Sequence, residues 1–262
     1  MTAADRERAA DLARWYDLDL RDDPGDLDLY RALLGRSEGA VLELAAGSGR
    51  LAVPLALAGH RVVALDLDPA MLGRSEAAWA ARRGRRPAER LRHVEADIVA
   101  ARLGERFPLV FIGLNSLLLL DRDAQAACFR TMAAHLAPGG LAVVDVLLPD
   151  ADDLALYDGR LQLEWVRTDP VTGEQVTKIA SARHDAATAT VDLVQIFEAT
   201  PPAGGPVRRR LRQDRLHLVS ARELVLLAEA AGLAVEGVMG DYQLSPLEPG
   251  AERAILLARL VE

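Results

Sequence analysis

The sequence of 262 residues contains little cysteine, lysine or histidine. Its single cysteine, Cys128, excludes an intrachain disulfide, and its five scattered histidines lack the spacing of a Cys/His metal site. We therefore expect no bound metal. Cys128 lies in a segment of apolar periodicity, which predicts a small buried side chain rather than a reactive thiol.

Long apolar runs are absent as well. No stretch approaches about 18 uninterrupted apolar residues, so no transmembrane helix is expected. The N-terminal segment MTAADRERAADLARWYD is charged throughout and has no apolar centre, which argues against a signal peptide. The formal net charge of -8 lacks the basic excess typical of proteins that bind DNA or RNA. These absences predict a cytoplasmic protein that binds neither membrane nor nucleic acid.

Half of the residues are hydrophobic, which is enough for one sizeable core. Helices are predicted at 3–17 and 27–34, and from residue 40 onward strand and helix patterns alternate. Strands are predicted at 41–44, 62–65, 92–96, 109–114 and 141–147, and helices at 51–57, 69–82 and 123–136. Most of these strands are almost wholly apolar, as expected when helices cover both faces of a sheet. The pattern predicts an α/β fold, a doubly wound and mostly parallel sheet.

The pattern changes after about residue 158, where alternating stretches separated by turn signals predict an antiparallel meander. A helix from Ser220 to Ala231 and strands at 234–239 and 254–260 would then complete a seven-stranded sheet. We accordingly predict four segments: an N-terminal helical cap (1–36), an α/β core (37–158), an antiparallel β insertion (159–218) and closing elements (219–262). The exposed edges of the insertion suit a lid or a homodimer surface.

The segment VLELAAGSGRLA contains a small-residue loop between a predicted strand and a predicted helix. Gly47 and Gly49 belong to a G-x-G-x-x-A pattern, and such loops bind ligands at the carboxyl edge of a parallel sheet. Glycine lets the backbone approach a ligand closely, and the following helix N-terminus adds free N–H groups. The pattern alone suits NAD as well as other nucleotide-like cofactors.

Three acidic residues around the loop distinguish between these cofactors. Glu43 lies four residues before Gly47, where a carboxylate is poorly suited to phosphates but suits a cationic ligand. Asp66, at the end of the next strand, can accept from ribose hydroxyls. Asp97 follows the third strand and can accept from an adenine amino group, while Ile98 offers its N–H to a ring nitrogen; Asp97 is alternatively a helix N-cap. This set indicates S-adenosylmethionine, which carries a sulfonium and an ammonium but no phosphate.

With these residues in view, the sequence resembles the class I S-adenosylmethionine-dependent methyltransferases. The matching pieces are VLELAAGSGR, VVALDLDPAML, VEADI, PLVFIGLNSLLLL and LAPGGLAVVDV, in the expected order over residues 40–147. The segment WYDLDLRDD and the meander further resemble the branch of glycine and amino-sugar N-methyltransferases. The resemblance implies a Rossmann-like fold in which cofactor contacts fall to Glu43, Ala45, Gly47, Gly49, Asp66, Leu67, Met71, Asp97, Ile98 and Leu114.

The resemblance also implies where the acceptor arrives. Leu114 and Asn115 would lie beside the sulfonium, and Asn115 is expected to contact the acceptor. Related N-methyltransferases often carry N-S-x-x-H-L here, but Leu119 occupies the histidine position. The acceptor therefore arrives already deprotonated, or a base comes from elsewhere, with His217 and Tyr16 as candidates.

The predicted function is methyl transfer to a small molecule in bacterial secondary metabolism, with N-methylation slightly favoured over O- or C-methylation. Two alternatives stay open. A fold relative can bind the cofactor and catalyse a non-methylating reaction such as cyclisation. A macromolecule such as protein or rRNA is a different class of methyl acceptor.

Overall fold

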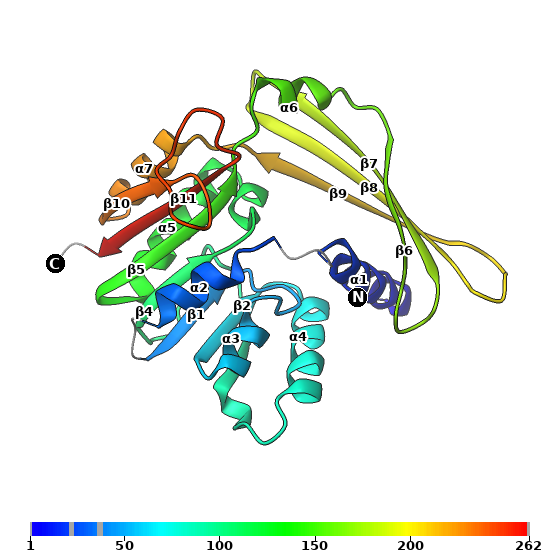
Figure 1. Ribbon diagram of the computed structural model, residues 1–262, viewed down its shortest axis with the longest axis horizontal. Coiled ribbons are helices and arrows are strands. Elements are labelled where there is room, and N and C mark those ends of the chain that lie inside the picture. The colour runs from blue at the N-terminus through cyan, green and yellow to red at the C-terminus, as the bar shows by residue number, and fades with distance from the viewer. Residues whose placement is uncertain (1, 21–23, 36–38, 261–262) are drawn as a thin grey trace. The chain divides into compact units, whose positions relative to one another are not determined.

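The computed structural model describes residues 2–20, 24–35 and 39–260 and divides into two compact units (Figure 1). One unit comprises Pro24–Pro149 and Val219–Glu262, and the other comprises Met1–Asp23 and Asp150–Leu218. Helix α1 (Ala3–Asp19) thus belongs with the insertion, whereas helix α2 (Leu27–Leu34) belongs with the α/β core. The predicted boundary between residues 36 and 37 lies outside the described residues.

The larger unit contains a seven-stranded sheet in the order β10-β11-β5-β4-β1-β2-β3. Its strands are β1 (Ala40–Leu44), β2 (Arg61–Asp66), β3 (Leu91–Glu95), β4 (Phe107–Ile112), β5 (Leu136–Leu147), β10 (Leu233–Met239) and β11 (Arg253–Leu260). Strands β1 to β5 pair in parallel, and β11 runs antiparallel to both β5 and β10. The predicted doubly wound, mostly parallel sheet of seven strands is confirmed.

Helices cover both faces of this sheet, with α2 and α3 on one face and α5 and α7 on the other (Figure 1). The remaining helices of the unit are α3 (Ala52–Ala58), α4 (Pro69–Arg82), α5 (Arg122–His135) and α7 (Ala221–Ala230), with short 3-10 helices at Ala88–Arg90 and Ser116–Leu119. Helix α4 begins at Pro69, as predicted, and Asp68 is its N-cap. Helix α7 has a capping box between Ser220 and Glu223.

The pair Gly139–Gly140, which would suit a turn between a helix and a strand, lies inside β5. The pairing of β5 with β4 shifts there, from Phe107 opposite Leu136 to Leu109 opposite Leu141. The extra residues of β5 form an irregularity that needs glycine, since φ of Gly139 is +70°. A glycine pair therefore marks a bulge inside a strand rather than the end of a helix.

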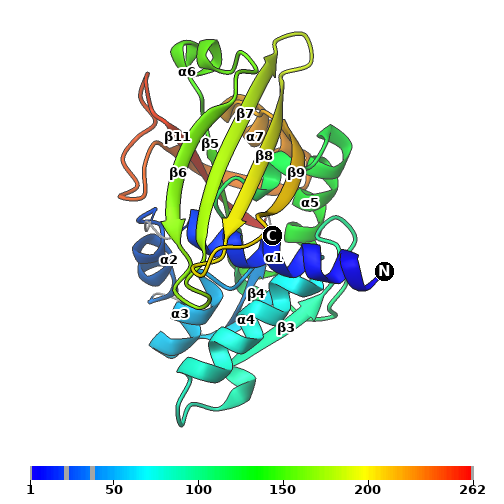
Figure 2. The ribbon, with the colours of Figure 1, turned by 90° about the vertical axis from the view of Figure 1, so that its right-hand side faces the viewer.

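The smaller unit contains the antiparallel meander in the order β6-β7-β8-β9 (Figure 2). Its elements are α1, α6 (Ala151–Leu156), β6 (Gln162–Thr168), β7 (Gln175–Asp185), β8 (Thr190–Thr200) and β9 (Arg208–His217). Trp15 and Leu18 of α1 pack against Phe197 and its neighbours on the sheet. Lys178 reaches back to Asp19 at 2.6 Å. Two segments far apart in sequence therefore share one small core.

No helix within residues 2–20, 24–35 and 39–260 combines the length and apolar character needed to cross a bilayer.

Candidate functional site

The polar residues singled out in the sequence gather at the carboxyl ends of four neighbouring strands. Along the sheet edge from β3 through β2 and β1 to β4 stand Asp97, Asp66, the glycine loop with Glu43, and the turn at Leu114–Asn115. Strands lie about 4.8 Å apart, so this row extends over roughly 14 Å. The row crosses the point between β1 and β4 where the strand order reverses, which is where such sheets bind ligands.

The loop after β1 adopts left-handed backbone at three residues: Ala45 (φ +54°), Gly47 (φ +56°) and Gly49 (φ +81°). A side chain added at Gly47 would meet no atom within 4 Å, so its backbone faces open space. The N–H of Gly49 donates to the carbonyl of Ala46 at 3.0 Å, which closes the turn before α3. The loop therefore presents bare backbone at a helix N-terminus.

Gly49 has a different reason to be glycine. A Cβ atom there would lie 2.1 Å from Oγ of Ser75, a fully buried residue of α4. Ser75 Oγ is itself hydrogen-bonded to Nε2 of His93 at 2.8 Å. The close approach of the loop to α4 thus depends on the missing side chain.

Asp66 ties the glycine loop to the next strand. Its Oδ2 accepts from the N–H of Gly47 at 2.7 Å, and its Oδ1 accepts from the N–H of Asp68 at 2.9 Å. Each carboxylate oxygen has a second lone pair, so hydroxyl donors can still be accommodated. The side chain expected to hold a ribose is therefore also the one that fixes the loop.

Glu43 lies on β1 just before the loop, with only 4% of its surface exposed. Among the described residues, its Oε2 has no hydrogen-bond partner. Burial raises the pKa of Glu43 to about 8; Arg50 opposes this rise, and the nearby Asp26 and Asp66 add to it. A buried carboxyl oxygen without a donor costs about 1–3 kcal/mol unless a ligand or water satisfies it. This orphaned acceptor fits a cationic group such as an ammonium.

The end of the row at β3 is formed by Asp97 and Ile98. Asp97 Oδ1 accepts from the N–H of Val99 at 3.0 Å, so it caps the short turn after β3, and its second oxygen is not used in this bond. Ile98 is buried, whereas Leu67 is 64% exposed beside Asp66. Met71 in α4 is half-buried. The exposed side chain of Leu67, next to Asp66, offers an apolar surface on which a flat ring can pack.

The turn after β4 has two consecutive non-glycine residues with positive φ, Leu114 (+46°) and Asn115 (+69°). Oδ1 of Asn115 accepts from the N–H of Leu147 at 2.7 Å and from Arg253 at 3.3 Å. The side-chain oxygen of Asn115 is thus engaged within the fold. Leu119 is 45% exposed in the following 3-10 helix.

Several polar residues of this region were not predicted from the sequence. Asp145 on β5 is 1% exposed and bonds with Arg253 and Tyr242, and Asp26 forms a two-point ion pair with Arg50 at 2.6 Å. The signal for Asp145 was present, because a single acid interrupts the apolar run LAVVDVLL. Its partners were not visible, because they lie on β11 and on the segment before it.

Tyr16 and His217 belong to the smaller unit. Tyr16 is half-buried on α1, where Trp15 rather than Tyr16 packs on Phe197, and His217 ends β9 opposite Thr190. The roles assigned to both stay predictions.

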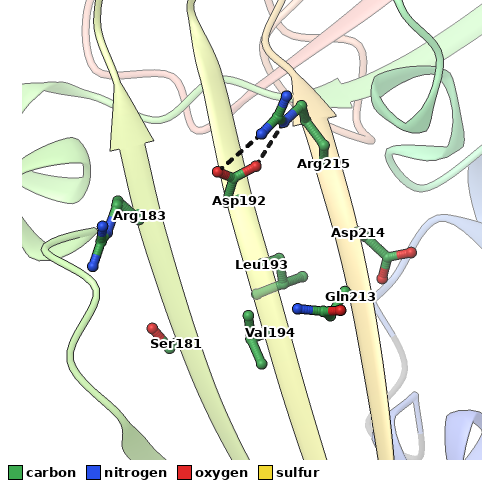
Figure 3. Close-up of a pocket in the computed structure, with 8 residues that line it drawn as sticks. All are labelled: Ser181, Arg183, Asp192, Leu193, Val194, Gln213, Asp214 and Arg215. Atoms are coloured by element: carbon green, nitrogen blue, oxygen red, sulfur yellow. Dashed lines mark hydrogen bonds and ion pairs between the residues drawn. The ribbon is translucent and has the colours of Figure 1, made fainter.

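The smaller unit also carries a shallow pocket of about 360 Å³ on one face of its sheet (Figure 3). Arg183, Asp192 and Arg215 stand side by side across β7, β8 and β9. Asp192 accepts from Arg215 Nε at 2.6 Å. The carboxylate that lies between the two arginines of the pocket is therefore already paired with one of them.

Among the described residues, no group of three His, Cys, Asp or Glu side chains is arranged to hold a metal ion. Cys128 is buried, and burial raises the pKa of its thiol to about 12. The thiol is therefore protonated and unreactive at neutral pH.

Residues 41–140 match the family described as "Methyltransferase domain". A Streptomyces protein, cypemycin N-terminal methyltransferase, is 27% identical over 218 residues, which cover 83% of this chain and 80% of the relative.

Among solved structures, the CcbJ methyltransferase of Streptomyces caelestis is 25% identical, with a TM-score of 0.76 and coverage of 92% of this chain and 98% of the other. CalS10 of Micromonospora echinaspora, an amino pentose methyltransferase of calicheamicin biosynthesis solved with S-adenosylmethionine bound, is 19% identical. Its TM-score is 0.65, with coverage of 98% and 91%.

Proposed function

Because the chain is a class I S-adenosylmethionine-dependent methyltransferase, we propose that it methylates an amine nitrogen of a small molecule in bacterial secondary metabolism. The orphaned, buried Oε2 of Glu43 beside the left-handed loop is the observation that carries the cofactor part of the proposal. It supplies an acceptor for the ammonium end of the cofactor.

When bound, S-adenosylmethionine supplies a methyl group already activated by the sulfonium. The chain's task is then to align the nucleophile with the methyl carbon and to exclude water. Under the proposal, Glu43, Ala45, Gly47 and Gly49 hold the methionine end, Asp66 the ribose, Leu67 and Met71 the adenosine rings, and Asp97 with Ile98 the adenine edge. Leu114 and Asn115 border the reacting centre.

The surroundings of Asn115 favour a nucleophile that needs no base. Asp145 is buried in an ion pair with Arg253 at 2.6 Å, and burial together with Asp145 raises the pKa of the neighbouring Tyr242 well above its usual value. Both oxygens of the Asp145 carboxylate already accept hydrogen bonds, and a protonated phenol is a poor proton acceptor at neutral pH. A neutral amine carries its own lone pair, whereas an alcohol must lose a proton first.

The names of two relatives are consistent with this choice. One is named for an N-terminus and the other for an amino pentose, and each of these groups contains an amine. The net charge of -8 disfavours nucleic acid as the acceptor. Tyr16 and His217 are proposed to contact the acceptor.

The acceptor class can be tested with methyl-labelled S-adenosylmethionine and matched acceptors that present an amine, a phenol or a carboxylate on the same small scaffold. We expect label on nitrogen together with accumulation of S-adenosylhomocysteine. Label found only on oxygen or carbon would contradict N-methylation. Product formation without S-adenosylhomocysteine would contradict methyl transfer itself.

We further propose that a second copy of the chain covers the pocketed face of the four-stranded sheet. An apolar row crosses it through Leu163, Ile179, Ile196 and Leu211, with Leu163 64% and Leu211 40% exposed. The ion pairs Arg215–Asp192 and Arg209–Glu198 lie on opposite sides of this row. A two-fold axis through the middle of this row would place the Arg215–Asp192 pair of one copy against the Arg209–Glu198 pair of the other, as an isologous interface requires.

The oligomeric state tests this surface. Light scattering should show a dimer for the unmodified protein and a monomer for Leu163→Asp. Leu226→Asp, which alters an exposed leucine on α7 of the other unit, is the matched control and should stay dimeric. A monomeric unmodified protein would exclude the interface.

A further inference from the structure

The turn at Leu114–Asn115 is held in an unfavourable conformation. Side chains other than glycine, asparagine and aspartate rarely adopt positive φ, and here Leu114 adopts it immediately before Asn115. Such backbone persists only where neighbouring groups over-determine it, and it clusters at functional sites. The question is which groups supply that constraint.

Asp145 binds both amides of the turn. Its side-chain Oδ2 accepts from the N–H of Leu114 at 3.1 Å, and its backbone carbonyl accepts from the N–H of Asn115 at 3.0 Å. Register explains the fit, since β4 and β5 run in parallel with Ile112 opposite Val144. Asp145 is therefore level with the first residue after β4.

Arg253 fixes Asp145 in turn. The other oxygen, Oδ1, accepts from Nε at 2.8 Å and from Nη2 at 2.6 Å of Arg253. The same Nη2 lies 3.3 Å from Oδ1 of Asn115, so one guanidinium bridges the acid and the turn. Arg253 begins β11, which pairs with β5 along its whole length.

Tyr242 closes the network. Its hydroxyl donates to Oδ2 of Asp145 at 3.1 Å, and the guanidinium of Arg253 lies over its ring, 5.1 Å from the centroid. The N–H of Leu114, the guanidinium of Arg253 and the hydroxyl of Tyr242 thus converge on the carboxylate of Asp145, a residue that is 1% exposed. Charged hydrogen bonds in such dry surroundings are short and directional, which makes the arrangement rigid.

We infer that Asp145 and Arg253 are positioning residues, which hold the Leu114–Asn115 turn in the left-handed form that meets the methyl-bearing sulfonium. This inference rests on the proposed cofactor site, because the turn stands at the β4 end of the row. Neither residue touches the reacting atoms in this scheme. They act through the turn, whose two amides both donate to Asp145.

The test uses Asp145→Asn, Arg253→Lys and the milder Tyr242→Phe. In Asp145→Asn one amide nitrogen replaces an oxygen, so either the Leu114 N–H or the guanidinium loses its acceptor. Arg259→Gln is the matched control. Arg259 lies on β11, as Arg253 does, and the substitution removes its exposed ion pair with Glu236 of β10. Circular dichroism and thermal melting establish which variants are folded, and Tyr242→Phe serves if the others are not.

The first measurement needs no ligand. Hydrogen exchange at the amides of Leu114 and Asn115 should accelerate about 10-fold or more in the variants, with the amides of β1 unchanged and the Arg259→Gln protein like the parent. Unchanged exchange at the turn would overturn the inference.

The second measurement compares two ligands that differ only in the sulfonium methyl. We expect the ratio of Kd for S-adenosylmethionine to Kd for S-adenosylhomocysteine to rise about 5-fold in Asp145→Asn and Arg253→Lys, and less in Tyr242→Phe. Equal weakening of both ligands would assign the network a general structural role and contradict the inference. If the parent binds neither ligand, the proposed function fails, while the exchange experiment still decides whether the network holds the turn.

Discussion

Proton release on cofactor binding follows from the environment of Glu43. Burial raises its pKa from 4.5 to about 8, so the side chain is protonated at pH 7 in the free protein. A cationic ammonium placed beside the orphaned Oε2 favours the carboxylate and expels that proton. With a pKa near 8, the free protein holds about 0.9 proton on Glu43 at pH 7 and about 0.1 at pH 9. The number of protons that Glu43 releases on cofactor binding cannot exceed these values.

Titration calorimetry in phosphate and in Tris measures the release, because the two buffers differ in ionisation enthalpy. Binding of S-adenosylmethionine at pH 7 should show enthalpies that differ between buffers, and the difference should shrink toward pH 9. Affinity should rise with pH up to about 8, by at most tenfold per unit, and then level off. Glu43→Gln carries no titrating proton and is the control; any release that it retains belongs to the ligand. Identical enthalpies in both buffers for the unmodified protein would refute the reasoning.

The same shift affects stability in the absence of ligand. The folded state binds the Glu43 proton more tightly than the unfolded chain, so the stabilising contribution is complete below about pH 4.5 and is lost as pH rises through about 8. Within that window the free energy of unfolding should fall by up to about 1.4 kcal/mol per pH unit from this group. Chemical denaturation of the unmodified protein and of Glu43→Gln at several pH values should show the slope only in the former.

Two further substitutions test the loop. Gly49→Ala should lower the free energy of unfolding by about 3 kcal/mol, because its Cβ would overlap Ser75. Gly59→Ala, also at positive φ but in open space, should lower it by only about 1 kcal/mol. Equal losses in urea denaturation would show that backbone conformation alone determines the loss of stability. Asp66→Ala removes the acceptor of two backbone amides. In calorimetry it should weaken the binding of S-adenosylmethionine and of S-adenosylhomocysteine alike by about 10-fold or more, and NAD should bind neither the unmodified protein nor the variant. Unchanged affinity for both ligands would show that Asp66 does not belong to the cofactor site.

Local sequence signals predicted the sheet well. Most strands of the core contain an apolar run, because burial on both faces leaves little room for polar residues, and each predicted strand overlaps an observed one. Glu43, Asp66 and Asp97 could be placed at the sheet edge because each stands at or near the end of such a run. Their roles toward the cofactor stay predictions.

The network around Asp145 could not be predicted in the same way. Its ion pair joins residues 108 positions apart, and only the antiparallel return of β11 onto β5 brings them together. The engagement of Asn115 has the same origin, since its oxygen binds Leu147 and Arg253 rather than a neighbour in sequence. Long-range register decides such contacts, and no local pattern encodes it.

The placement of α1 on the meander has a consequence for how the chain folds. Asp11 of α1 pairs with Arg208 of β9 across 197 positions, and Trp15 needs Phe197 to be covered. A helix of this length is marginal in water without such packing. During synthesis α1 therefore leaves the ribosome well before β9, the fourth strand of the meander, against which it packs. Contacts of this separation slow folding, because a long loop must close before they form. Helix α1 is thus made before the meander but is stabilised only after the meander is complete.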